Sequence, residues 1–272
     1  MRCPYCNSEV RDGSRFCTEC GATLNAAAAP QNTGRLVANT GMMLGAAARE
    51  ARRQAVYTED QLISDRAYNG ILLGVLLWGL LVNVLLCGFA EDLYYGVLYR
   101  VNPLVILIGY VICSFVGILI AGKSSKPLVS FLGYNLVVVP FGLVIAILVQ
   151  AYGGMDSEIV RDAFLYTMLI ALGTTGAALA FPQLFAKLGG TLLGVLIGLV
   201  LCEVVLLILG RDQAVTDWIA AGLFSLYIGF DVYRSQQFAK TVDNAVDCAL
   251  DIYLDLANLF IRLLSILSKR KD

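Results

Sequence analysis

The sequence predicts an all-α polytopic membrane protein, and two observations carry this prediction. Of its 272 residues, 58% are hydrophobic and 15% are charged, which is far outside the composition of an ordinary soluble domain. The charged residues cluster between apolar runs of about 20 residues, the length that spans the hydrocarbon core of a bilayer. We therefore expect the excess of apolar side chains to face lipid.

Seven apolar segments of roughly this length follow one another along the chain. They run over residues 70–89, 104–121, 128–150, 163–181, 189–209, 214–231 and 247–267. These segments predict a seven-helix transmembrane domain over residues 65–268. The last segment is the least hydrophobic, and the sequence leaves open whether it crosses the bilayer completely or re-enters.

The distribution of basic residues predicts which side each loop faces. The first residues lack the apolar stretch of a cleavable signal peptide, so we expect the N-terminus to stay in the cytoplasm. The loops that this orientation makes cytoplasmic contain Lys123, Lys126, Lys187, Arg234 and Lys240. The opposite loops are mainly acidic, as the positive-inside rule requires. Only the basic tail Lys269–Lys271 conflicts with seven full crossings, because it would end outside.

Four cysteines near the N-terminus have the spacing of a zinc site. Cys3 and Cys6 form one C-x2-C pair, and Cys17 and Cys20 form a second. Four thiolates complete the tetrahedral shell of a structural Zn²⁺ and leave no open position for a catalytic water. Two disulfides are the alternative in an oxidising compartment. The segment resembles the short zinc ribbons at the N-termini of many bacterial membrane proteins, which implies a docking or folding role and a bacterial plasma membrane.

The zinc ribbon is expected to occupy residues 1–24 and to be tethered by a linker. Residues 25–64 contain first an Ala-, Pro- and Gly-containing stretch without a hydrophobic pattern, and then most of a helical stretch over about residues 42–67. This stretch contains Arg49, Arg52, Arg53 and Arg66. One interpretation is that these arginines bind anionic lipid at the membrane surface. The other is that they form a solvated face of the helix. The net charge of −1 and the lack of a concentrated basic face give no support to a nucleic-acid partner.

Glycines and prolines predict local features of the spans. Gly190, Gly194 and Gly198 recur at every fourth position, which is typical of a groove where a second helix approaches closely, either within the chain or from another copy. Pro140 predicts a kink in the third span, and Pro182 predicts the end of the fourth.

Acidic residues inside the apolar segments are the most unusual feature. Asp247, Asp251 and Asp255 recur at i+4 spacing in the last segment and therefore share one helical face. An ionised side chain at the bilayer centre costs at least about 2.5–3.5 kcal/mol, so this face is expected to point into the bundle or toward water. Arg262 returns to nearly the same face and is a candidate partner for a neighbouring acid. The alternative is that Asp247 and Asp251 are solvated at the interface while Arg262 reaches toward it.

The last segment also carries a family resemblance. Residues Tyr253-Leu254-Asp255 followed by Asn258-Leu259-Phe260 resemble the closing signature of the transmembrane Bax inhibitor motif family. Residues 163–210 are similar to the middle helices of that family, and residues 224–237 are similar to the segment that presents its other membrane aspartate, here Asp231. The resemblance covers about residues 65–268.

This resemblance implies a seven-helix bundle with the last helix at its centre. It also implies a paired aspartate site, Asp231 with Asp255, that shares a proton and controls a pH-sensitive calcium leak. Two carboxyl groups in a low dielectric cannot both ionise cheaply, so a shared proton is able to latch two helices together. Phe230 precedes Asp231 where the family usually has Tyr, and the second span has no arginine to accompany the pair.

Two functions remain open at this point. The first is a cation leak, with calcium as the expected ion because hard Ca²⁺ prefers oxygen ligands. The second is a non-conducting adaptor that recruits a cytoplasmic partner, such as a membrane protease or a stress regulator, through the zinc ribbon. Enzymatic activity is not expected, because the chain lacks the Gly-x-Gly-Asp signature of intramembrane aspartyl proteases and contains no His.

Overall fold

The computed structural model describes residues 61–89, 101, 103–123 and 126–269, and every described regular element is a helix. The helices are α2 (Asp65–Gly88), α4 (Pro103–Lys123), α5 (Pro127–Ala151), α6 (Glu158–Ala180), α7 (Pro182–Ala186), α8 (Gly189–Ile208), α9 (Ala214–Gln237) and α10 (Val242–Lys269). The all-α prediction is confirmed. The predicted count of seven is wrong for these residues, which form eight helices because the short α7 separates α6 from α8. The zinc ribbon lies outside the described residues.

Local sequence explains where several helices begin and end. The Ser64 hydroxyl caps α2 by accepting a hydrogen bond from the backbone N–H of Ala67 at 3.3 Å. Pro127 and Pro182 stand at the starts of α5 and α7, where a missing backbone N–H has no cost. Pro182 follows the end of α6 at Ala180, as predicted. Gly153 turns the chain between α5 and α6 with a φ of 97°, which a residue with a side chain rarely adopts.

Five described helices are long and apolar enough to span a membrane. They are α2, α5, α6, α8 and α9. In α4, the stretch Ile108–Lys123 is apolar but shorter. Helix α10 has sufficient length but carries several charged side chains, in line with its predicted place as the least hydrophobic segment.

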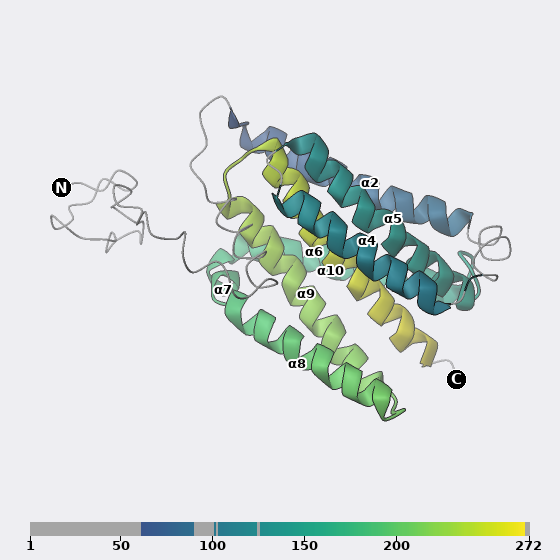
Figure 1. Ribbon diagram of the computed structural model, residues 1–272. Coiled ribbons are helices and arrows are strands. Elements are labelled where there is room, and N and C mark those ends of the chain that lie inside the picture. Colours follow the sequence, from purple (N-terminus) through teal and green to yellow (C-terminus); the bar gives the residue numbers. More distant parts are fainter. Residues whose placement is uncertain (1–60, 90–100, 102, 124–125, 270–272) are drawn as a thin grey trace, which may run out of the picture. The chain divides into compact units, whose positions relative to one another are not determined.

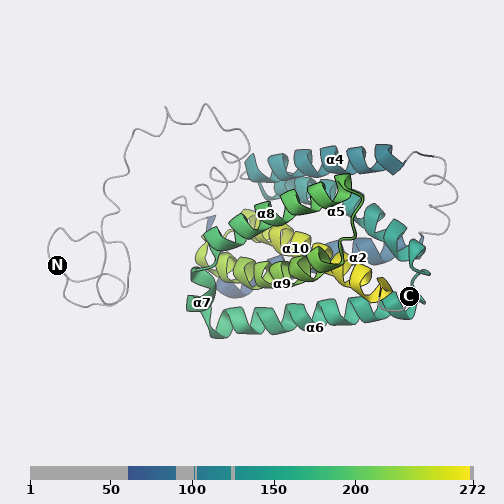
Figure 2. The same cartoon turned by 90° about the horizontal axis from the view of Figure 1, so that it is seen from below.

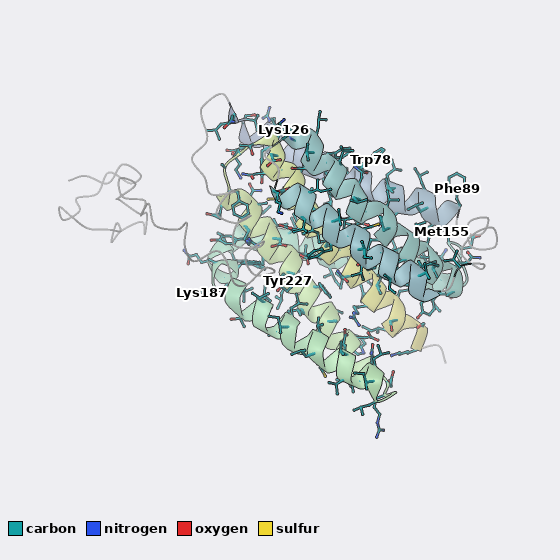
Figure 3. The ribbon with its side chains drawn as sticks, in the orientation of Figure 1. Trp78, Phe89, Lys126, Met155, Lys187 and Tyr227 are labelled. Atoms are coloured by element: carbon teal, nitrogen blue, oxygen red, sulfur yellow. The ribbon has the colours of Figure 1, made fainter. Side chains whose placement is uncertain are left out.

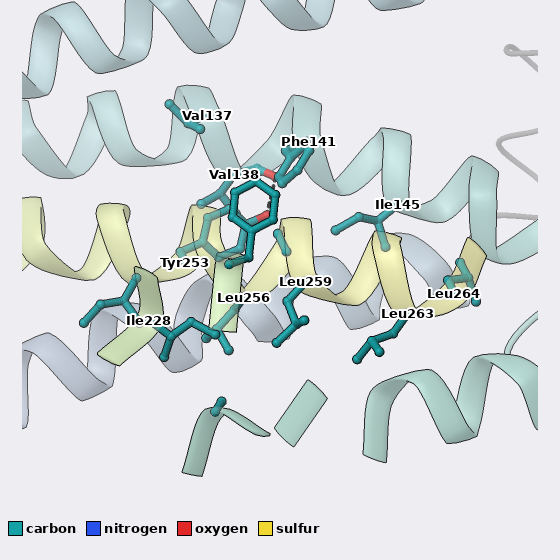
Figure 4. Close-up of a cluster of buried hydrophobic side chains, with 14 of the residues drawn as sticks. Val137, Val138, Phe141, Ile145, Ile228, Tyr253, Leu256, Leu259, Leu263 and Leu264 are labelled. Atoms are coloured by element: carbon teal, nitrogen blue, oxygen red, sulfur yellow. Dashed lines mark hydrogen bonds between the residues drawn. The ribbon is translucent and has the colours of Figure 1, made fainter. Parts of the chain in front are cut away.

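Helix α10 forms the core of the bundle. It packs against α2, α5, α6 and α9, and it contains more buried residues than any other described helix. Figure 1 shows α10 in yellow passing between α5 and α9, and Figure 2 shows α6 and α4 on opposite sides of the bundle. Tyr253, Leu256 and Leu259 of α10 meet Val138 of α5 and Ile228 of α9 in the cluster of Figure 4.

The space around the glycines shows that the helices approach each other closely at a different place from the one predicted. A Cβ on Gly190, Gly194 or Gly198 of α8 would meet no atom within 4 Å among the residues with described positions. The close approach is instead between α4 and α5, where a Cβ on Gly133 would lie 2.7 Å from the carbonyl oxygen of Gly117. The predicted groove on α8 therefore does not receive another described helix of this chain.

Candidate functional site

Aspartates follow the inward face of the N-terminal half of α10. Asp243, Asp247, Asp251 and Asp255 are separated by four residues each, which places them on successive turns of one face. Asp247 is 1% exposed and Asp255 is 7% exposed, while Asp251 is half-buried. This face therefore points into the bundle, because lipid-facing side chains in this structure are largely exposed.

The structure brings Asp255 of α10 next to Asp231 of α9. The two carboxyl groups are within hydrogen-bonding reach of each other, and Asp251 adds its negative charge from one turn away. Two carboxyl groups can share a hydrogen bond only when at least one carries a proton, because an ionised carboxylate only accepts. Oxygen Oδ2 of Asp255 is buried and has no partner among the described residues. The arrangement can therefore hold a proton between two helices.

Arg234 supplies the positive charge at this pair. Its Nη1 lies 3.5 Å from Oδ1 of Asp231, and its guanidinium lies over the rings of Phe230 and Phe238 at 5.2 and 5.5 Å from their centroids. The charge of Arg234 also acts on Asp255. The prediction that Arg234 is a loop residue is wrong, because it lies in the last turn of α9. Its spacing of three residues from Asp231 is the signal that identifies it.

Tyr227 completes the surroundings of the pair. It lies one turn before Asp231 on α9, close enough to both aspartates to interact with them electrostatically. Figure 3 shows Tyr227 on α9 within the bundle and not at either end of it. The site thus consists of Tyr227, Asp231 and Arg234 from α9 and Asp251 and Asp255 from α10.

Arg262 belongs to a separate polar cluster at the other end of α10. Its Nη1 lies 2.7 Å from Oε1 of Glu203 on α8, and the same nitrogen donates to Oδ1 of Asp217 on α9 at 2.9 Å. Ser265 donates to Oδ2 of Asp217 at 2.8 Å. The ion pairs of Arg262 are therefore with α8 and α9, and the acids of its own helix are not its partners.

Lys269 and Asp212 extend this cluster beyond the end of α8. Lys269 Nζ lies 2.8 Å from Oδ1 of Asp212, and the same nitrogen lies 3.3 Å from Oδ2 of Asp217. The hydrogen bond from Lys269 lowers the pKa of the exposed Asp212 carboxyl below its ordinary value. The cluster joins three helices, including α8, which otherwise packs mainly on α9.

A neutral hydrogen-bond network joins α10 to α2 and α5 near the aspartate pair, with Tyr253 two residues before Asp255. Asn83 of α2 donates to the hydroxyl of Tyr253 on α10 at 2.9 Å, and Tyr253 lies close to both the Oδ1 atom of Asn83 and the carbonyl oxygen of Val138 on α5. Tyr134 of α5 donates to the carbonyl oxygen of Val75 on α2 at 2.9 Å. These bonds hold α10 and α5 together with α2.

Lys240 lies in the connection between α9 and α10 and forms hydrogen bonds to the end of α9. Its Nζ donates to the carbonyl oxygens of Ser235 and Gln236, each at 3.1 Å, and lies 4.4 Å from the ring centroid of Tyr68. Burial lowers the pKa of the Lys240 ammonium group, and the nearby Asp65 carboxylate partly opposes this shift. Lys240 therefore holds this end of α9 and α10 against the start of α2.

The metal site predicted from Cys3, Cys6, Cys17 and Cys20 lies outside the described residues. Its donor set fits zinc, because four thiolates form a closed tetrahedral site. Elsewhere, the described part of the chain has no group of three or more Cys, Asp or Glu side chains arranged to hold a metal ion.

Comparison with known proteins agrees with both parts of the chain. Residues 61–272 match a family model described as inhibitor of apoptosis-promoting Bax1, and residues 2–24 match a zinc-ribbon domain. Both resemblances predicted from the sequence are confirmed.

Among curated relatives, an uncharacterized protein of Helicobacter pylori strain 26695 is 38% identical over 90 residues. An uncharacterized protein of strain J99 has the same identity over the same length. Each match covers 32% of this chain and 38% of the relative.

Proposed function

The chain belongs to the family of inhibitors of apoptosis-promoting Bax1, and on this premise we propose that it is a pH-sensitive cation leak pathway with calcium as the conducted ion. It is a multi-pass membrane protein with an N-terminal zinc-ribbon domain. The proposed latch is the pair Asp231 and Asp255. No enzymatic activity is part of this proposal.

The observation that carries the proposal is the close approach of the Asp255 and Asp231 carboxyl groups, both of which are buried between α9 and α10. With one proton present, the two carboxyl groups attract each other. When both are ionised they repel, and this repulsion is strong because little water screens it. The proton count therefore changes the free energy with which α9 is held on α10, and Arg234 limits the repulsion by pairing with Asp231. This is a two-state element that pH is able to bias.

The same acids explain why a cation is the conducted species. Asp243, Asp247 and Asp251 continue the negative face from the pair toward the start of α10. Carboxylate oxygens are the ligands that calcium prefers, and a row of them attracts cations electrostatically. A leak requires calcium binding that is weak enough for the ion to leave again, and we expect this row of acids to bind it weakly.

The experiment measures calcium entry into liposomes that contain the purified full-length protein and a calcium dye, between about pH 6 and pH 8. Wild-type flux is expected to change across this range. Asn is neutral at every pH and imitates a protonated carboxyl, so Asp255→Asn is expected to give a flux that does not vary with pH and equals the wild-type flux at the acidic end.

Asp156→Asn is the matched control, because Asp156 is exposed in the α5–α6 loop. This variant is expected to keep the wild-type pH profile. Absence of flux above that of empty liposomes at every pH would overturn the leak proposal. A flux that still varies with pH in Asp255→Asn would mean that the pH dependence of the leak does not come from the aspartate pair.

The zinc-ribbon domain favours a second candidate function. In this alternative the membrane domain is an anchor, and the zinc ribbon recruits a cytoplasmic protein such as a membrane protease or a stress regulator. A closed four-cysteine site supplies a rigid surface for such docking and has no catalytic position.

The adaptor function predicts a different set of sensitive residues. Replacing Cys17 and Cys20 by Ser removes two zinc ligands, so capture of the partner by the full-length protein is expected to be lost while liposome flux is unchanged. Asp255→Asn is expected to leave partner capture intact. Equal loss of capture in both variants would contradict a separate adaptor role.

The proposed orientation places the N-terminus in the bacterial cytoplasm. Lys126 and Lys187 lie at one end of the bundle, and Phe89 and Met155 lie at the other (Figure 3). Lysines at the proposed cytoplasmic end support this orientation through the positive-inside rule. A membrane-impermeant thiol reagent applied to intact cells is expected to leave the zinc-ribbon cysteines unlabelled; labelling without permeabilisation would reverse the orientation.

A further inference from the structure

A cavity separate from the aspartate pair opens on the side of the bundle. Its volume is about 310 Å³, within the usual range of small-molecule sites of about 300–1,000 Å³. The lining side chains come from α2, α5, α6 and α10 and from the α5–α6 loop, and they include Val84, Arg161, Phe164, Leu256 and Ala257. We call this cavity the lateral groove.

The interior of the lateral groove is apolar. Its two buried polar side chains already have partners, because Asn83 bonds to Tyr253 and the Thr167 hydroxyl donates to the carbonyl oxygen of Ala163 at 2.7 Å. Val84, Met155 and Phe164 flank it and are each about half exposed, at 46%, 46% and 51%. The groove thus opens toward the apolar surface that faces lipid.

Arg161 is the single charged side chain among the residues that line the groove within the described part of the chain. It is exposed and lies in the first turn of α6, which begins at Glu158. A helix end is where the lipid phosphates meet a membrane-spanning helix. Glu158 and Asp162 are neighbours in sequence but do not line the groove.

We propose that the lateral groove binds one acidic membrane phospholipid, with an acyl chain in the apolar groove and the head-group phosphate on Arg161. A guanidinium matches phosphate geometry through paired N–H groups, and an apolar slot of this volume takes a hydrocarbon chain without leaving polar atoms unpaired. Leu256, Ala257 and Phe260 of α10, of which Leu256 directly follows Asp255, contribute to the lining of the groove. The lipid therefore contacts the central helix directly.

The test uses the full-length protein in phosphatidylcholine vesicles that contain a small fraction of phosphatidylglycerol with a photoreactive group in its acyl chain. After illumination, mass spectrometry locates the labelled peptides. Labelling is expected in the stretches of α2, α6 and α10 that line the groove. The variant Arg161→Gln lacks the positive charge, and its labelling in the groove is expected to be about fivefold lower than that of the wild type. This is the effect of one basic residue near a lipid surface.

Two matched controls separate a built site from general lipid contact. Arg211→Gln removes an exposed arginine outside the groove, in the α8–α9 turn, and is expected to leave labelling unchanged. Val84→Trp fills the groove from an exposed position and is expected to reduce labelling, whereas Val204→Trp, at a similarly exposed position of α8, is not.

The proposal is overturned if the same probe on phosphatidylcholine labels the groove equally well, or if Arg161→Gln and Arg211→Gln behave alike. Labelling spread evenly over all lipid-facing helices also overturns it. Stronger competition by a free fatty acid than by phosphatidylglycerol would assign the groove to a different amphiphile and reject the phospholipid. None of these labelling outcomes depends on ion conduction. The absence of calcium flux in liposomes would therefore overturn the leak proposal and leave the lipid-site proposal untouched.

Discussion

Replacing Arg262 by Met is expected to lower the free energy of unfolding by about 3–5 kcal/mol, the cost of removing one partner from a buried ion pair. Asp217 has a side chain that is 5% exposed and that of Glu203 is 17% exposed, so neither carboxylate regains full hydration when Arg262 is removed. Denaturant unfolding of the purified protein in detergent, followed by circular dichroism, measures this change.

A compensated variant tests whether the cost comes from the uncompensated charges. Met at position 262 combined with Glu203→Gln and Asp217→Asn removes the charges together, and this variant is expected to recover most of the lost stability. Arg211→Met, at an exposed arginine, is expected to have an effect within about 0.5 kcal/mol. Equal stability of Arg262→Met and wild type would mean that the cluster does not hold α8, α9 and α10 together.

The second large effect is expected at the crossing of α4 and α5. A Cβ at Gly133 would lie 2.7 Å from both the backbone nitrogen of Ala121 and the carbonyl oxygen of Gly117. Because these are backbone atoms, they cannot move aside by changing a rotamer. Gly133→Val is therefore expected to destabilise the protein by about 1–3 kcal/mol through overpacking, measured as a lower unfolding midpoint in denaturant.

Gly173→Val in α6 is the matched control, because a Cβ there meets no described atom within 4 Å. It carries the same intrinsic cost of a β-branched residue in a helix without the clash. The difference between the two variants isolates the α4–α5 contact. A Gly173 variant as unstable as the Gly133 variant would assign the effect to helix propensity instead.

The long helices were predictable from the sequence because lipid imposes a simple rule on length and polarity. Each of the seven apolar segments corresponds to one long helix, and Pro182 marks the end of the fourth. Helix α7 was not predicted, since five residues are too few to show a periodic pattern. The face formed by Asp247, Asp251 and Asp255 followed from i+4 spacing alone.

Contacts between helices were less predictable. Arg262 pairs with residues 45 and 59 positions away, and spacing within one helix carries no information about such partners. The glycine repeat of α8 identified a smooth helix surface but not a neighbour, whereas the isolated Gly117 and Gly133 form the close crossing. The lateral groove was also invisible in the sequence, because its lining comes from four helices and a loop.

The most direct test of the central claim detects the proton itself. Infrared difference spectra of the purified protein in lipid, recorded between the acidic and basic ends of the flux range, report the C=O stretch of a protonated, hydrogen-bonded carboxyl group. The shared-proton account predicts one such band, which is lost in Asp231→Asn and in Asp255→Asn and kept in Asp156→Asn. A spectrum whose carboxyl bands are the same in wild type and both pair variants would contradict it.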